Sequence, residues 1–113
     1  MSFTKADLAI STMWNFRKAH SGEELIDQLT ALGFSRVELN YQVRTEWLSG
    51  IRRRIAEGAI EVSSVHNVFP KTLDKRFDTD SVMLGYEDEA LRQQAVELAK
   101  GSVEWACVLG AGA

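Results

Sequence analysis

The chain contains few of the residues that would indicate a disulfide framework, a built-in zinc site or a membrane span. Its 113 residues include one cysteine, one proline and two histidines. A single cysteine excludes an internal disulfide, and so few histidines and cysteines exclude a self-contained zinc module. No apolar run approaches the length of a membrane span, and the first residues, "MSFTKADLAIST", lack the pattern of a signal peptide. We therefore expect a cytoplasmic protein without a membrane partner.

Strong positive charge is also missing. The net charge is −3 and the sequence pI is about 5.4, so we expect no nucleic-acid partner. The one basic run, Arg52-Arg53-Arg54, has the composition of a solvated helix face. Cys107 lies among apolar helical neighbours, which predicts a small buried core residue. A length of 113 residues corresponds to one domain or part of one.

Strand-like and helix-like segments alternate along the chain. Residues 8–14, 35–41 and 60–66 have the residue types of strands, and a helical pattern follows each of them. Ser21 and Glu24 match a capping box for the first helix, Thr45 is positioned to cap the second, and the third covers residues 87–109. Residues 71–85 are expected to form an irregular loop. The three helices are predicted to end at Gly33, Gly58 and Gly110. Each helix has a stripe of residues predicted to be buried: Leu25, Ile26, Leu29 and Leu32 in the first, Leu48, Ile51 and Ile55 in the second, and Leu91, Ala95, Leu98, Ser102, Ala106 and Leu109 in the third.

This alternation predicts an α/β fold with a parallel sheet in the order first, second, third strand. Two architectures fit the pattern. One is a segment of a TIM (β/α)₈ barrel, which places all the helices on one face of the sheet. The other is an open, doubly wound domain, whose helices are divided between both faces. No GxGxxG follows the first strand, which weighs against a dinucleotide site, but periodicity does not separate the two architectures.

In both architectures ligands bind at the carboxyl ends of the strands. The polar and aromatic residues at those ends are Trp14, Asn15, Glu38, Asn40, His66 and Asn67. Alternation in the second strand puts Val37, Leu39 and Tyr41 on one face, which leaves Glu38 and Asn40 on the other.

Each of these residues also has a purely structural interpretation. Strict alternation groups His66 with Ile60, Val62 and Ser64, so its facing stays open, and it could be a hydrogen-bonded structural residue. Glu38 could pair with a neighbouring cation. Trp14 could pack in the core or stack on a sugar ring. The sequence contains no complete catalytic constellation.

The segments "LAISTMWN", "LGFSRVELN", "VSSVHNVFP" and "DEALRQQAVELAKGSVEWACVLGA" together resemble the first three units of xylose isomerase-like TIM barrels. The resemblance is to the sugar phosphate isomerase/epimerase family, whose superfamily includes endonuclease IV. It implies a (β/α)₈ barrel that holds a divalent metal (Mn, Zn, Co or Mg) in the complete protein, with its main ligands on later strands. It also implies catalytic roles for Glu38 and His66 and substrate contacts for Trp14, Asn15, Asn40 and Asn67.

From this resemblance we expect residues 1–113 to be a single incomplete domain, the N-terminal part of such a barrel. The complete protein would isomerise or epimerise a sugar or sugar phosphate by metal-assisted proton transfer, with Glu38 orienting substrate or metal-bound water and His66 bonding a substrate hydroxyl. The chain alone is expected to be inactive and to hold no metal. The alternatives are an endonuclease IV-like metal-dependent phosphodiesterase, or an inactive stand-alone fragment that self-associates through open strand edges.

Overall fold

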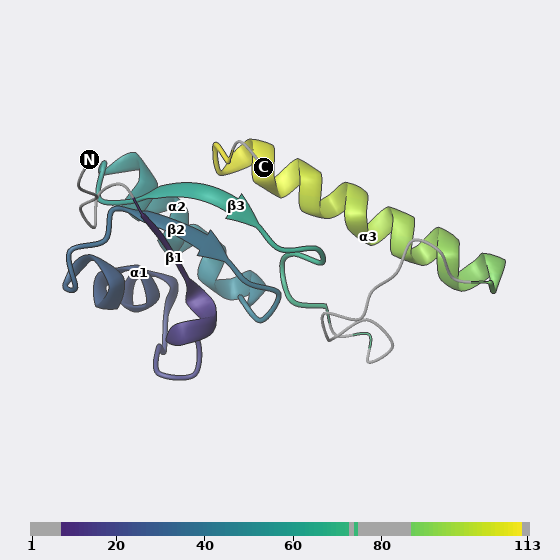
Figure 1. Ribbon diagram of the computed structural model, residues 1–113, viewed down its shortest axis with the longest axis horizontal. Coiled ribbons are helices and arrows are strands. Elements are labelled where there is room, and N and C mark those ends of the chain that lie inside the picture. The colour runs from purple at the N-terminus through teal and green to yellow at the C-terminus, as the bar shows by residue number, and fades with distance from the viewer. Residues whose placement is uncertain (1–7, 73, 75–86, 112–113) are drawn as a thin grey trace.

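The computed structural model describes residues 8–72, 74 and 87–111. Its regular elements are β1 (Ala9–Ser11), α1 (Gly22–Thr30), β2 (Arg36–Leu39), α2 (Leu48–Ala56), β3 (Glu61–Val65) and α3 (Glu89–Val108), with short 3₁₀ turns η2 (Thr12–Trp14) and η3 (Thr45–Trp47) (Figure 1). The strands form one parallel sheet in the order β1-β2-β3. The predicted α/β alternation and strand order are confirmed. Of the expected loop over residues 71–85, residues 73 and 75–85 lie outside the described residues.

The helix boundaries follow local signals in most places. The Ser21 hydroxyl accepts a hydrogen bond from the Glu24 backbone N–H at 3.0 Å, as a capping box predicts. The Glu24 carboxylate, however, contacts His20 Nδ1 at 3.3 Å and accepts from Gln28 Nε2 at 3.2 Å. Gly33 has a φ of 93° just after α1, in the left-handed region that glycine adopts most easily.

The sequence predictions for the end of the first strand and for the cap of the second helix are wrong. The first strand ends at Ser11, because the Ser11 hydroxyl accepts from the Met13 backbone N–H at 3.1 Å and the chain turns into η2. Thr45 does not cap the second helix. It is the first residue of η3, and the residue in the cap position of α2, Trp47, makes no side-chain capping bond.

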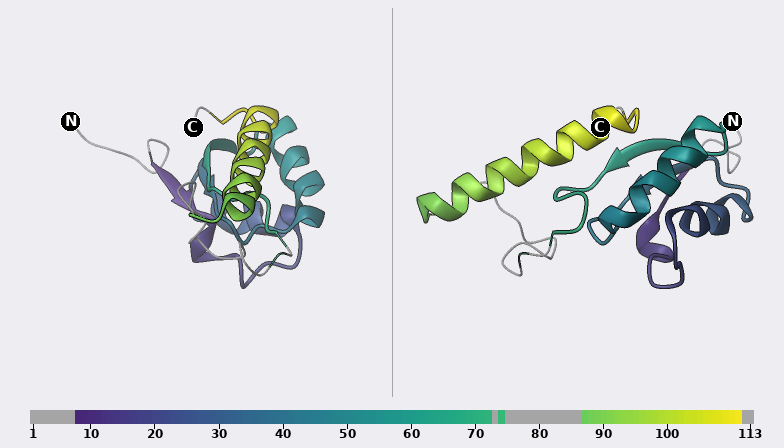
Figure 2. Two further views of the ribbon diagram at one scale, coloured as in Figure 1. Left: turned by 90° about the vertical axis from the view of Figure 1, so that its right-hand side faces the viewer. Right: turned by 180° about the vertical axis from the view of Figure 1, so that it is seen from behind.

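The hydrophobic core lies on one face of the sheet. Strand residues Val37, Leu39 and Val62 are at most 2% exposed, and all three helices contribute to the same cluster. The helical residues are Leu25, Ile26 and Leu29 from α1, Leu48 and Ile51 from α2, and Leu109 just after α3, with Trp105 of α3 packed against the cluster. The first half of α3 projects beyond the end of the sheet (Figures 1 and 2).

Several residues predicted to be buried are not. Leu32 is 40% exposed because α1 ends at Thr30, and Leu91 and Leu98 lie outside the core cluster. Cys107 is exposed, contrary to prediction, because α3 turns Ala95, Ser102 and Ala106 inward and leaves the position after Ala106 facing solvent. Among the tryptophans, Trp47 is buried, whereas Trp14 is 51% exposed.

The helix pair α1 and α2 packs with almost no space between the backbones. A Cβ atom added to Gly22 would collide with the carbonyl oxygen of Trp47, and one added to Gly50 would collide with Glu23. Glycine is therefore required at both positions by close approach rather than by backbone conformation.

A bidentate ion pair joins the same two helices. Arg54 Nε lies 2.8 Å from Asp27 Oδ1, and Arg54 Nη2 lies 3.0 Å from Asp27 Oδ2. Arg54 also contacts Glu57 at 3.2 Å, and its side chain is only 22% exposed. The prediction of a solvated basic face therefore fits Arg52 and Arg53, which are exposed, but is wrong for Arg54.

We predict that Asp27→Asn lowers the thermal midpoint at pH 7. Hydrogen bonds from Arg54 lower the pKa of the Asp27 carboxyl below its ordinary value of 3.8. A lowered folded-state pKa stabilises the fold above the ordinary value, and this contribution disappears as the pH falls through the lowered pKa. The difference between wild type and variant should therefore be present at pH 7 and shrink below about pH 4. Thermal melts followed by circular dichroism, with Glu104→Gln as the exposed control, would measure it. A difference that stays constant down to pH 2 would contradict this role.

Candidate functional site

A row of polar side chains crosses the sheet face opposite the core. Ser11, Glu38 and Ser64 are register partners on β1, β2 and β3. Because Val37 and Leu39 point into the core, alternation turns Glu38 to this open face, where it is exposed. The Glu38 carboxylate makes no hydrogen bond or ion pair with any residue that the structure describes. The open face thus carries an unpaired carboxylate at the carboxyl end of the central strand.

The pairing of β2 and β3 contains a β-bulge at Ser63. Val37 is paired with Val62, and the next residue, Glu38, is paired with Ser64, so Ser63 is an extra residue in β3. The Ser63 hydroxyl donates to the Val37 carbonyl at 3.1 Å. Two backbone hydrogen bonds show the same extra residue. Glu61 N–H donates to Ser35 O and His66 N–H donates to Leu39 O, both at 2.9 Å. Between these bonds the third strand covers one residue more, from 61 to 66, than the second strand, from 35 to 39.

The bulge decides the facing of His66, which strict alternation left open. Val62 and Val65 both pack against the core although they are three residues apart. His66 therefore follows Val65 onto the open face, opposite Asn40 and on the same side as Glu38. Glu38 and His66 consequently share one end of the sheet, as predicted.

The His66 ring lies against Tyr41, with ring centroids 5.3 Å apart. His66 Nδ1 is buried and has no hydrogen-bond partner among the described residues. The sequence predicted Tyr41 on the core face with Val37 and Leu39. Because β2 ends at Leu39, that alternation does not extend to Tyr41, and the pattern gave no signal of its contact with His66.

Hydrogen bonds of Asn40 link the end of β2 to the end of β1. Its backbone N–H donates to the Thr12 hydroxyl at 2.9 Å, and the same hydroxyl donates to Asn40 Oδ1 at 2.7 Å. Thr12 is 0% exposed and Asn40 is 1% exposed, so both bonds are shielded from water. Asn40 Nδ2 also contacts Met13 Sδ at 2.8 Å. The oxygen and the nitrogen of the Asn40 side-chain amide are therefore both already in contact with other protein atoms.

Two further residues that were predicted to bind substrate, Asn15 and Asn67, also form hydrogen bonds within the protein. Asn15 is 0% exposed, and its Nδ2 donates to Leu25 O at 2.9 Å and to Gln28 Oε1 at 3.0 Å. Asn67 Oδ1 accepts from the Ser102 hydroxyl of α3 at 3.3 Å. These contacts hold η2 to α1 and the end of β3 to α3. Trp14, by contrast, lies on the surface with the Lys18 ammonium group 4.2 Å from its ring centroid.

The described residues do not form a metal centre. They contain no group of three or more His, Cys, Asp or Glu side chains arranged to hold a metal ion. A catalytic metal needs about three protein ligands, and this end of the sheet offers Glu38 and His66.

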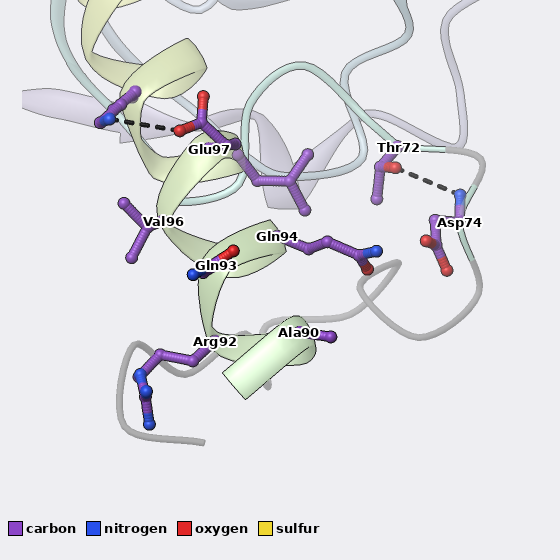
Figure 3. A pocket seen from close by; sticks show the side chains of 10 residues that line it. Thr72, Asp74, Ala90, Arg92, Gln93, Gln94, Val96 and Glu97 are labelled. Atoms are coloured by element: carbon purple, nitrogen blue, oxygen red, sulfur yellow. Dashed lines mark hydrogen bonds and ion pairs between the residues drawn. The ribbon is translucent and has the colours of Figure 1, made fainter. Parts of the chain in front are cut away.

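A separate cavity lies between the first half of α3 and the segment that contains Thr72 and Asp74 (Figure 3). It measures about 910 Å³, and Gln93, Gln94 and Glu97 are among its described lining residues. Neither Glu38 nor His66 lines it. It is therefore not part of the site at the strand ends.

Comparison with protein-family models, with curated proteins and with solved structures finds no match for this chain. Within the part of the chain that the structure describes, every helix is too short or too polar to cross a membrane.

We predict that Thr12→Val destabilises the fold by about 1–3 kcal/mol, because it leaves the buried Asn40 N–H without its partner. Thr30→Val is the matched control. Among the described residues its hydroxyl bonds the nearby Asp27 carbonyl alone, at 3.2 Å in an exposed setting, so a smaller effect is expected. Urea denaturation of both variants would measure the difference, and equal losses would contradict a special role for the Thr12–Asn40 pair.

The bulge predicts opposite outcomes for two changes in β3. Exchanging Ser64 and Val65 (Ser64→Val with Val65→Ser) creates strict apolar alternation, so the strand should become regular and turn His66 toward the core. Deleting Ser63 should instead keep His66 on the open face, because Val62, Ser64 and Val65 then alternate in the register already present beyond the bulge. Nuclear Overhauser contacts between the Tyr41 and His66 rings would be lost in the exchange variant and kept in the deletion variant. The reverse result would contradict the bulge.

Proposed function

We propose that this chain provides the first three βα units of a xylose isomerase-like barrel of the sugar phosphate isomerase/epimerase type. Its part in that function is to bind a hydroxylated sugar at the carboxyl ends of the strands. The observation that carries the proposal is that Glu38 and His66 lie at the same end of one polar sheet face. The carboxylate lacks a partner among the described residues, and so does His66 Nδ1.

The arrangement of the layers supports a barrel segment. All three helices contribute to one core on a single face of the parallel sheet. A doubly wound domain would place helices on both faces. Parallel sheets are normally covered on both sides, and in a barrel the face opposite the helices is the interior. A polar row in that position, Ser11, Glu38 and Ser64, suits an interior that receives a polar ligand.

The two side chains complement a sugar hydroxyl. An ionised carboxylate only accepts hydrogen bonds, whereas neutral imidazole has one donor and one acceptor nitrogen. A hydroxyl placed between them would donate to Glu38 and accept from His66. Both residue types also serve as general acids and bases, which isomerisation and epimerisation require in order to move a proton between carbon atoms.

Catalysis belongs, in this proposal, to the complete protein. The described residues do not fit a metal centre, so the divalent metal implied by the resemblance, Mn, Zn, Co or Mg, would depend on ligands from other parts of a complete barrel. Within the described sheet, β1 and β3 each pair only with β2. Their outer edges are where further strands of a barrel, or a second copy of the chain, would pair.

Sugar binding by the chain itself tests the proposal without requiring activity. Titration with an aldose, a ketose and their phosphates, followed by ¹⁵N–¹H NMR spectra, should shift the amide resonances of Glu38, Ser64 and His66. Glu38→Gln and His66→Gln should each weaken binding by about tenfold, because each removes a hydrogen bond to a charged or buried group.

Two exposed residues of the same types are the matched controls. Glu104→Gln and His20→Gln change residues outside the candidate site and should leave the affinity unchanged. Saturable binding that shifts other resonances, or an equal loss in the control variants, would contradict the proposed site.

A further inference from the structure

Two loops meet at the carboxyl end of the sheet. One runs from Asn40 to the start of η3, and the other follows His66 at the end of β3. Lys71 N–H donates to Val43 O at 2.8 Å, which ties the loops together. Val43 is 0% exposed and Phe69 is 1% exposed, so both loops are anchored in the interior. Their surface residues are therefore held in a fixed arrangement next to the strand ends.

A cavity of about 380 Å³ opens where these loops meet. Its described lining residues are Arg44, Thr45, Glu46 and Lys71. This volume is in the range of small-ligand pockets. The lining supplies two cations, one hydroxyl group and one carboxylate.

The two cations are available to a ligand. Neither Arg44 nor Lys71 forms an ion pair with a residue that the structure describes. Three other arginines are paired, Arg36 with Glu61, Arg53 with Glu23, and Arg54 with Asp27 and Glu57. The Arg44 guanidinium is instead placed over the buried Trp47 ring, 5.4 Å from its centroid, which limits the directions the side chain adopts.

We infer that this cavity binds a phosphate group, the dianion of a phosphomonoester. Guanidinium groups bind phosphate oxygens in pairs, and an ammonium group adds a compact positive charge. The Thr45 hydroxyl is a further donor. Glu46 opposes the anion, so the four described lining residues together carry one net positive charge. The inference rests on the proposed function in one respect: it makes the substrate a sugar phosphate rather than a free sugar.

Inorganic phosphate is the probe for this site. Its titration into the whole chain, followed by ¹⁵N–¹H NMR spectra, should produce saturable shifts at the amides of residues 44–46 and 71. Arg44→Gln and Lys71→Gln should each weaken phosphate binding by about tenfold. Arg52→Gln, which removes an exposed arginine from α2, should leave it unchanged, and Glu46→Gln should strengthen it. Equal weakening by Arg52→Gln, or wild-type affinity in both Arg44→Gln and Lys71→Gln, would overturn the site.

A free sugar and its phosphate, titrated separately, distinguish the two proposals. Phosphate shifts at Arg44 and Lys71 without any sugar-induced shift at Glu38 and His66 would support the phosphate site and remove the proposed sugar site. Sugar-induced shifts at Glu38 and His66 without any effect of phosphate at Arg44 and Lys71 would overturn the phosphate site alone. If both hold, the sugar phosphate should bind at least about tenfold more tightly than the free sugar.

Discussion

Burial of Val62 and Val65 in a single hydrophobic core is the constraint on which the candidate site depends. A regular strand turns residues three positions apart to opposite faces. Both valines nevertheless pack on the helix side, and the chain achieves this by placing Ser63 in a bulge whose hydroxyl bonds the Val37 carbonyl. As a consequence, His66 emerges beside Tyr41 on the open face. Packing of the apolar core thus sets the direction of the imidazole.

Buried polar bonds then hold the strand ends in place. The Thr12 hydroxyl joins β1 to Asn40 at the end of β2, and the Ser102 hydroxyl accepts from Phe69 N–H at 2.9 Å, fixing the segment after β3 to α3. Shielded bonds of this kind are costly to break, because a buried group left without a partner has lost its water as well. The side-chain amides of Asn15, Asn40 and Asn67 therefore hold neighbouring elements together, while Glu38 and His66 face the open side.

Some charges of the described residues are paired and others are not. Between α1 and α2, Arg54 and Asp27 neutralise each other in an ion pair. At the carboxyl ends of the strands, Glu38, Arg44 and Lys71 have no ion-pair partner among the described residues. Unpaired charges of both signs at one end of a parallel sheet, where α/β folds bind ligands, are the physical basis for proposing a sugar there and its phosphate in the neighbouring cavity.

The sequence alone determined the α/β alternation, the three strands of the described sheet and the helix ends near glycine, since these depend on periodicity and on residues a few positions apart. The positive φ angles of Gly33, Gly58 and Gly110 agree with that local origin. Tertiary structure decided the exposure of Cys107, the ion pair of Arg54 and the contact between Tyr41 and His66. It also decided the facing of His66, because a bulge is defined by the partner strand: Ser63 and Ser64 are identical in the sequence, and only pairing with Val37 and Glu38 selects which of them is extra.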